Sequence, residues 1–158
     1  MIEVQVLVND CDRKAISMIK TAAKKALEIV SKGKKYALTI SIGSDEFVHE
    51  LNKTYRNIDR PTDVLSFSEE YIIPGTSTVY LGDIAISYPT ARIQAEQAGH
   101  PVINELSLLA IHGVLHLLGF DHQDEDQKMQ MWALQHQILE EIGIKMAHFS
   151  GDEQIEKE

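Results

Sequence analysis

Three histidines between residues 112 and 122 constrain this chain more than any other feature. His112 and His116 stand four residues apart in an apolar stretch, so in a helix both imidazoles project from one face about one turn apart. Gly119 follows where that helix should end, and glycine readily takes the left-handed conformation that reverses a chain. His122 can then approach the same point from beyond the turn. The segment therefore predicts a helix and a tight turn that bring three imidazoles together.

Three clustered imidazoles indicate a metal site. Neutral imidazoles on an apolar helix need polar partners, and a metal ion supplies one. Three histidine ligands leave one position of a tetrahedral zinc open for water, as in catalytic sites, and imidazole favours zinc over magnesium or calcium. We expect one Zn²⁺ ion bound by His112, His116 and His122, in a metal-dependent hydrolase. The alternative, ordinary helix and turn histidines, stays open at this point.

The spacing H-x-x-x-H-x-x-G-x-x-H is also that of the metzincin zinc proteases. In those enzymes the residue after the first histidine is a glutamate, which acts as the general base. Here that position is Gly113. A protease mechanism would therefore lack its base, and the metal geometry must serve different chemistry.

The hydrophobic periodicity predicts an α+β fold with a small mixed four-stranded sheet packed with about five helices. The metal site falls on a helix of the C-terminal half and on the turn after it. Strands cluster in the first half of the chain, and the third and fourth are expected to form a hairpin. The expected strands are 2–8, 36–42, one entered from the loop at 61–68, and 79–87; the expected helices are about 12–31, 44–56, 88–98, 102–118 and 125–143.

Composition limits the size and partners of the protein. The 158 residues include 44% hydrophobic and 25% charged residues, which fits one globular core. We expect a single metallohydrolase domain over 1–150 and an acidic, frayed tail over 151–158. The net charge of −9 argues against a protein that coats nucleic acid, although a nuclease with one local basic strip remains possible.

The compartment is expected to be the cytoplasm. Cys11 is the only cysteine of the sequence, so no internal disulfide can form, and it is expected to be a small half-buried residue without a chemical role. No apolar run is long enough to span a bilayer, and the first residues do not resemble a signal peptide. We therefore expect no membrane partner.

Several side chains are expected to have structural roles only. Met129, Met131 and Trp132 are interpreted as core residues of the last helix. The histidines outside the cluster are interpreted as surface or capping residues: His49, His100, His136 and His148.

Three segments of the chain together carry a family pattern. The first is HGVLHLLGFDH at 112–122. The second is LNKTYR at 51–56, followed by Asp59 and by PTDVLSF at 61–67, and the third is LGDIAIS at 81–87. Together they resemble the YbeY family of bacterial endoribonucleases, with Phe120 where tyrosine is frequent in that family's signature. The resemblance covers most of the chain from about residue 40 to 125, in the same order.

The resemblance implies a single-strand-specific, zinc-dependent endoribonuclease. Its expected role is ribosomal RNA processing, notably maturation of the small-subunit RNA 3′ end, and ribosome quality control, with the ribosome or its small subunit and associated proteins as partners. It implies that His112, His116 and His122 bind the zinc and that Arg56 is a catalytic or phosphate-binding arginine. His112 and His116 are counted with Arg56 as catalytic.

Roles for five further residues are weaker hypotheses. Asp121 could orient a ligand histidine or cap the next helix, and Asp83 could face the site. Lys53, Tyr55 and Arg60 lie around Arg56 in the sequence and could bind a single RNA strand through charge and base stacking.

Two questions stay open. The nucleophile could be a metal-activated water or the neighbouring 2′-hydroxyl of the RNA. The protein could also be a ribosome-associated assembly factor with a mainly structural zinc, or a zinc-dependent protease or amidohydrolase.

Overall fold

The computed structural model describes residues 1–9 and 11–146, and this part of the chain forms four strands and five helices. The expected tail 151–158 and His148 lie outside the described residues, so the division of the chain at residue 150 stays a prediction. In chain order the elements are β1 (Ile2–Val6), α1 (Arg13–Ser31), β2 (Tyr36–Gly43), α2 (Asp45–Arg56), β3 (Val64–Ile72), β4 (Val79–Ser87), α3 (Tyr88–Ala98), α4 (Val102–Leu117) and α5 (Glu125–Glu141).

The strands form one mixed sheet in the order β1-β2-β4-β3. β1, β2 and β4 are parallel neighbours, whereas β3 runs antiparallel to β4. The turn between β3 and β4 is closed by a hydrogen bond from the amide of Ile73 to the carbonyl of Thr78, 2.9 Å. The α+β class, the four-stranded mixed sheet and the hairpin are therefore confirmed.

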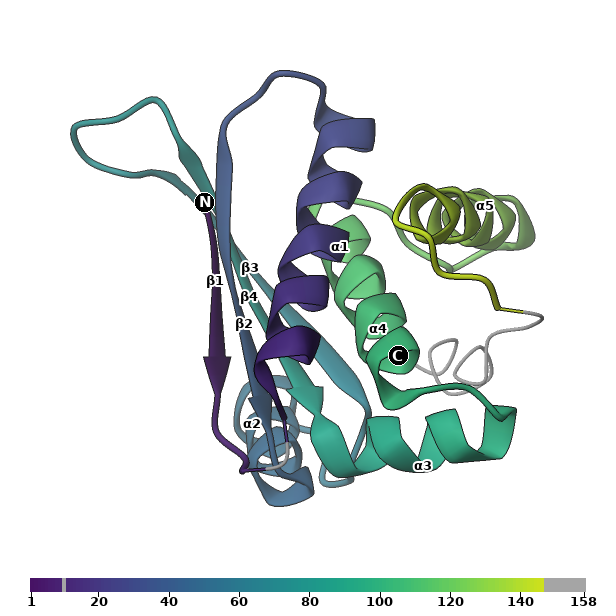
Figure 1. Ribbon diagram of the computed structural model, residues 1–158. Helices are drawn as coiled ribbons and strands as arrows, with labels where there is room; N and C mark the ends of the chain where they lie inside the picture. Colours follow the sequence, from purple (N-terminus) through teal and green to yellow (C-terminus); the bar gives the residue numbers. More distant parts are fainter. Residues whose placement is uncertain (10, 147–158) are drawn as a thin grey trace.

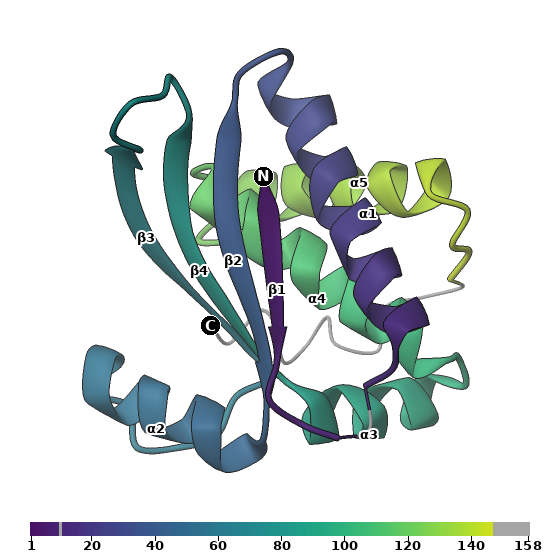
Figure 2. The same ribbon diagram turned by 60° about the vertical axis from the view of Figure 1, so that its left-hand side comes forward.

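Helices cover the two faces of the sheet unequally. α1 and α4 lie side by side against one face, and α5 packs on α4 from outside (Figures 1 and 2). The other face carries α2, which buries Val48 against Leu65 and Ala85 of the hairpin strands. Alternation along β4 explains this division, because Ile84 and Ile86 point to the α4 side and Ala85 to the α2 side.

α4 is the central element of the core. Leu106, Leu108, Leu109 and Ile111 are fully shielded, and burial continues through Val114 and Leu115. A helix that is apolar almost all round must be enclosed on most sides. Here the sheet, α1, α3 and α5 all contact it.

The last helix, α5, differs from the sequence expectation in the burial of its apolar residues. Met131 is buried, as predicted. Trp132 is only half-buried, and Met129 is 64% exposed, so the assignment of Met129 to the core is wrong. Position 129 lies on the outer side of α5, where periodicity alone does not distinguish an apolar surface residue from a core one. Cys11 is half-buried, as expected.

The first strand is shorter than expected, since β1 ends at Val6 and not at residue 8. The second half of β3 is exposed, and the register shifts between Ser68 and Tyr71. No helix in the described residues is long and apolar enough to cross a membrane.

Gly113 lets α4 approach the sheet closely. A Cβ atom added at this position would lie 2.8 Å from Cγ2 and 2.9 Å from Cδ1 of Ile84 on β4. Ile84 is itself 1% exposed and has little room to move. Position 113 therefore faces the sheet, and a glutamate there would have to enter the core.

We predict that Gly113→Ala lowers the free energy of unfolding by about 1–3 kcal/mol, even though alanine is the better helix former by about 1 kcal/mol. Urea denaturation measures this. In an Ile84→Ala background the same change should cost less, because the added methyl group then has space. An equal cost in both backgrounds would show that the contact with Ile84 is not what excludes a side chain.

Candidate metal centre

The end of α4 positions the three histidines. His112 and His116 lie one turn apart on the helix, which ends at a glycine with φ +100°. The amide of Gly119 donates to the carbonyl of His116, 3.0 Å, and the amide of Phe120 to that of Leu115, 3.0 Å. This left-handed ending reverses the chain, as the glycine predicted, and returns His122 toward the helix.

The three imidazoles form one compact group. Their ring centroids are 4.6 Å apart for His112 and His116, 5.2 Å for His116 and His122, and 5.7 Å for His112 and His122. One ligand nitrogen from each ring lies within 4.8 Å of the other two. Three residues from two segments thus present nitrogen atoms to one small space.

Each of these histidines has a buried nitrogen without a partner. In the described part of the chain, Nε2 of His112, His116 and His122 is shielded from solvent and makes no hydrogen bond. An unsatisfied buried polar atom is costly, and three at one point are not explained by packing. A cation between them would satisfy all three, so the donor set fits a zinc ion.

Gln135 fixes the orientation of the first histidine. Nδ1 of His112 lies 2.8 Å from Oε1 of Gln135, a residue of α5 that is 0% exposed. An amide oxygen can only accept, so Nδ1 carries the proton and Nε2 keeps its lone pair for a ligand. Metal-binding histidines commonly have such a second partner.

Burial keeps two of the imidazoles neutral. Burial and then the neighbouring His116 hold the pKa of His112 well below its usual value. Burial and then His122 lower the pKa of His116 to about 4. Both rings are therefore neutral near pH 7, the form that binds metal.

Asp121 supports the turn next to these ligands. Its Oδ1 accepts a hydrogen bond from the backbone amide of His122, 2.7 Å. The alternative role predicted for it, capping the next helix, is wrong, because Asp124 caps α5 by accepting from the amide of Gln127, 2.8 Å. Asp121 instead holds the backbone that carries the third histidine.

Arg56 is connected to the histidine helix through one strand residue. Its guanidinium donates to the backbone carbonyl of Ser66 on β3, and Oγ of Ser66 lies 3.3 Å from the carbonyl oxygen of Gly113, the acceptor. The positive charge of Arg56 adds to burial and to His122 in lowering the pKa of His116. The guanidinium is therefore within electrostatic reach of the imidazoles.

The other predicted RNA-binding residues surround Arg56. Lys53 and Tyr55 are exposed on the last turns of α2, and Arg60 is exposed in the loop after it. The Tyr55 ring meets the edge of Phe67, with centroids 5.8 Å apart. All three are exposed on α2 or in the loop after it, and their role in binding RNA stays a proposal.

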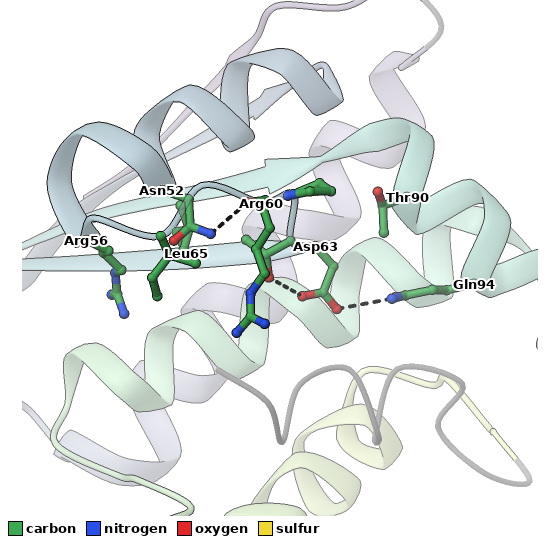
Figure 3. Close-up of a pocket in the computed structure, with 10 residues that line it drawn as sticks. Asn52, Arg56, Arg60, Asp63, Leu65, Thr90 and Gln94 are labelled. Atoms are coloured by element: carbon green, nitrogen blue, oxygen red, sulfur yellow. Dashed lines mark hydrogen bonds between the residues drawn. The ribbon is translucent and has the colours of Figure 1, made fainter.

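A cavity of about 300 Å³ opens beside Arg56, in the loop between α2 and β3 (Figure 3). Arg60 and Asn52 line it with Asp63 and Gln94. Asp63 is 3% exposed, and burial raises its pKa to about 6, although a hydrogen bond from Gln94 opposes this. A buried carboxyl group therefore lines the same cavity as two arginines.

Asp83 is not part of the histidine site. It pairs with Phe67 in the sheet and lines a groove on the α2 side, whereas the histidine helix covers the opposite face. Its carboxylate accepts a hydrogen bond from the hydroxyl of Tyr80. The hypothesis that Asp83 faces the metal is therefore wrong, because strand alternation turns it away.

The remaining described histidines have different surroundings. His49 is half-exposed and lies 2.8 Å from a carboxylate oxygen of the exposed Asp59. His100 lies 2.9 Å from Oε1 of Glu105, a residue that is 0% exposed. The interpretation of His100 as a surface or capping residue is wrong, since it is the partner of a buried carboxylate. His136 is exposed on α5.

Sequence reasoning missed the polar residues that support the site. Gln135 is one, although it stands four residues after the buried Met131 and three before Ile138, on the apolar side of α5. A polar residue in such a row signals a buried hydrogen bond. Asp63 and Gln94 were also missed, because their contact joins residues 31 positions apart.

Known proteins are similar to this chain in sequence and in fold. The sequence profile of the family Endoribonuclease YbeY matches residues 3–143. A protein of that name from Bacillus mycoides is 38% identical over 136 residues, covering 82% of this chain and 87% of its own length. One from Heliobacterium modesticaldum is 43% identical over 117 residues, covering 68% and 70%. The solution structure of a Thermotoga maritima protein superposes with a TM-score of 0.59 at 26% identity and covers 90% of this chain and 89% of that one. This chain therefore belongs to the endoribonuclease YbeY family.

Proposed function

We propose that this chain is a zinc-dependent endoribonuclease that cuts single-stranded RNA in ribosomal RNA processing. Its proposed task is maturation of the 3′ end of the small-subunit RNA and ribosome quality control, in the cytoplasm and in contact with the small ribosomal subunit. The observation that supports it most is a group of three histidine nitrogens without a partner among the described residues, within electrostatic reach of Arg56, in a chain of an endoribonuclease family.

The three histidines would hold the metal, and neighbouring residues orient two of them. His112 is oriented by Gln135, and His122 by the turn that Asp121 supports. A zinc ion bound there supplies a Lewis acid that stabilises negative charge on a phosphoryl oxygen. Burial keeps His112 and His116 neutral before any ion arrives.

Arg56 is proposed to bind the phosphodiester that is cut. Cleavage places extra negative charge on the phosphoryl oxygens, and a guanidinium donates to two such oxygens at once. The guanidinium of Arg56 donates to one backbone carbonyl and lies over the ring of Phe67, with Cζ 5.5 Å from the ring centroid. Among the described residues no carboxylate pairs with it, so its charge is available to a substrate.

The surface around Arg56 suits a single strand. Lys53 and Arg60 supply positive charge, and Tyr55 is 68% exposed, with a ring on which a base can stack. This patch gives the acidic chain, with its net charge of −9, a local basic surface for RNA. A protease is a weaker candidate, because position 113 faces Ile84 and has no space for the glutamate base.

We predict that Gln135→Met weakens zinc binding by about 10–100-fold, because His112 then loses the acceptor that fixes its ring. Competition with a fluorescent chelator measures the dissociation constant. Gln137→Met is the matched control, since this residue is exposed on the same helix, and it should leave affinity unchanged. His116→Ala should abolish tight binding altogether. Unchanged affinity in Gln135→Met would remove the orienting role of that amide.

We predict that Arg56→Gln lowers the rate of cleavage of single-stranded RNA by about 100-fold or more while zinc affinity is kept. Gel analysis of an end-labelled RNA with zinc-loaded protein gives the rate. Arg13→Gln, an exposed arginine at the start of α1, is the control and should cut like the wild type.

Chelation of the wild-type protein should abolish the same cleavage, and zinc should restore it. Casein incubated in parallel should remain intact. If Arg56→Gln cut RNA at the wild-type rate, the role of Arg56 would be lost. If zinc-loaded wild type cut no RNA, the structural-zinc assembly factor would replace the nuclease.

A further inference from the structure

The cavity between α2, β3 and α3 is separate from the three histidines but shares Arg56 with their surroundings. Its polar lining includes Asn52 and Arg56 of α2, Arg60 and Asp63 of the loop after it, and Thr90 and Gln94 of α3 (Figure 3). Its volume of about 300 Å³ falls at the small end of ligand pockets. A single flat ring system can be accommodated there.

Two buried side chains that carry acceptor oxygens, Asp63 and Gln94, line the cavity. Oδ1 of Asp63 also accepts from Oγ1 of Thr62, 3.5 Å. Asp63 and Gln94 are each 3% exposed. Nε2 of Gln94 donates to Oδ2 of Asp63, 3.2 Å, so this contact directs the amide oxygen away from the carboxylate. Oε1 of Gln94 is buried and has no hydrogen-bond partner in the described part of the chain. A buried acceptor left without a donor is costly, so a ligand with N–H groups would stabilise this wall.

The opening of the cavity is positively charged. Arg56 and Arg60 are both exposed, and in the view of Figure 3 their guanidinium groups extend to the same side as the carboxylate of Asp63. The apolar part of the lining comes from Ile58, Pro61 and Leu65. The cavity therefore matches a flat ligand with donors at its inner edge and negative charge at its outer end.

Among RNA components, guanine fits this description best. Its Watson–Crick edge carries two adjacent donors, N1–H and the N2 amino group. Adenine and cytosine place one amino donor beside a ring acceptor, and uracil places one N–H between two carbonyls. An ionised carboxylate only accepts hydrogen bonds, so it pairs with two adjacent donors and is repelled by a ring acceptor.

We propose that this cavity binds a guanine base of the RNA strand, with Asp63 and Gln94 accepting from its Watson–Crick edge and Arg56 and Arg60 at the phosphates beside it. This assignment rests on the proposed nuclease function and adds a sequence preference to it. Because Arg56 is shared with the metal centre, the bound guanine lies next to the phosphodiester that is cut.

The test compares nine-nucleotide single strands that differ only at the central base, in a background of adenosines. The centre is guanosine, inosine or adenosine, and each strand carries a terminal fluorophore. Fluorescence anisotropy with chelated full-length protein at pH 8 measures binding without cleavage. Inosine lacks only the N2 amino group, so its strand should bind about tenfold more weakly than the guanosine strand, as for a lost hydrogen bond to a charged acceptor.

Asp63→Asn keeps the shape of the side chain but replaces an acceptor with a donor, and it should abolish the preference for guanosine over inosine. Glu96→Gln is the control, because Glu96 is an exposed carboxylate on the same helix as Gln94 and does not line the cavity. It should keep the preference. If Asp63→Asn does not fold, as judged by circular dichroism, Gln94→Met tests the same wall.

Equal binding of the guanosine, inosine and adenosine strands to the wild type would overturn the proposal. A preference that survives both Asp63→Asn and Gln94→Met would overturn it as well. Neither result bears on the nuclease function, which is tested by zinc-dependent cleavage of the adenosine strand. Loss of that cleavage with an intact guanosine preference would instead reject the nuclease and keep the binding site.

Discussion

The enclosure of helix α4 is the constraint on which the site depends. The sheet and three other helices contact α4, so most of its side chains are excluded from water. His112 is carried into this interior with an exposed fraction of 1%. Water cannot satisfy a buried imidazole, and the described residues supply a partner for only one of its nitrogens. Packing of the core therefore leaves a buried imidazole nitrogen without a hydrogen-bond partner, and a metal ion can bind it.

The same close packing explains the residue that follows the first histidine. Gly113 brings α4 against Ile84, and its carbonyl oxygen accepts a hydrogen bond from Ser66. The backbone carbonyl oxygen of Ser66 accepts a hydrogen bond from the guanidinium of Arg56. Ser66 thus links Arg56, the proposed phosphate-binding residue, to the backbone next to His112, a proposed metal ligand. The absence of a protease-type glutamate is a consequence of helix–sheet contact as well as of chemistry.

Most of the fold follows from local pattern, because its elements have clear periodicity and clear ends. Ser44 caps α2 as predicted, accepting from the amide of Phe47 at 3.1 Å. Gly119 ends α4 in the predicted left-handed conformation. The grouping of three histidines also follows from spacing along one helix and one turn. Their metal-binding role and the identity of the ion stay proposals.

What sequence could not provide depends on contacts between distant segments. Asp83 was placed near the metal because strand alternation does not say which face α4 covers. Gln135 lies 23 residues after His112, with which it forms a hydrogen bond. Asp63 and Gln94, which also share a hydrogen bond, are 31 residues apart in the sequence. Met129 was assigned to the core because an apolar residue at the edge of a helix face has the same local signal as a buried one.

X-ray absorption at the zinc edge, on protein loaded with one equivalent of zinc, tests the central claim most directly. The account predicts three imidazole ligands at about 2.0–2.1 Å and one further oxygen ligand, with one imidazole lost in His122→Ala. A spectrum with no more than one imidazole, or one unchanged in His122→Ala, would contradict the assignment of the three buried nitrogens as the metal site.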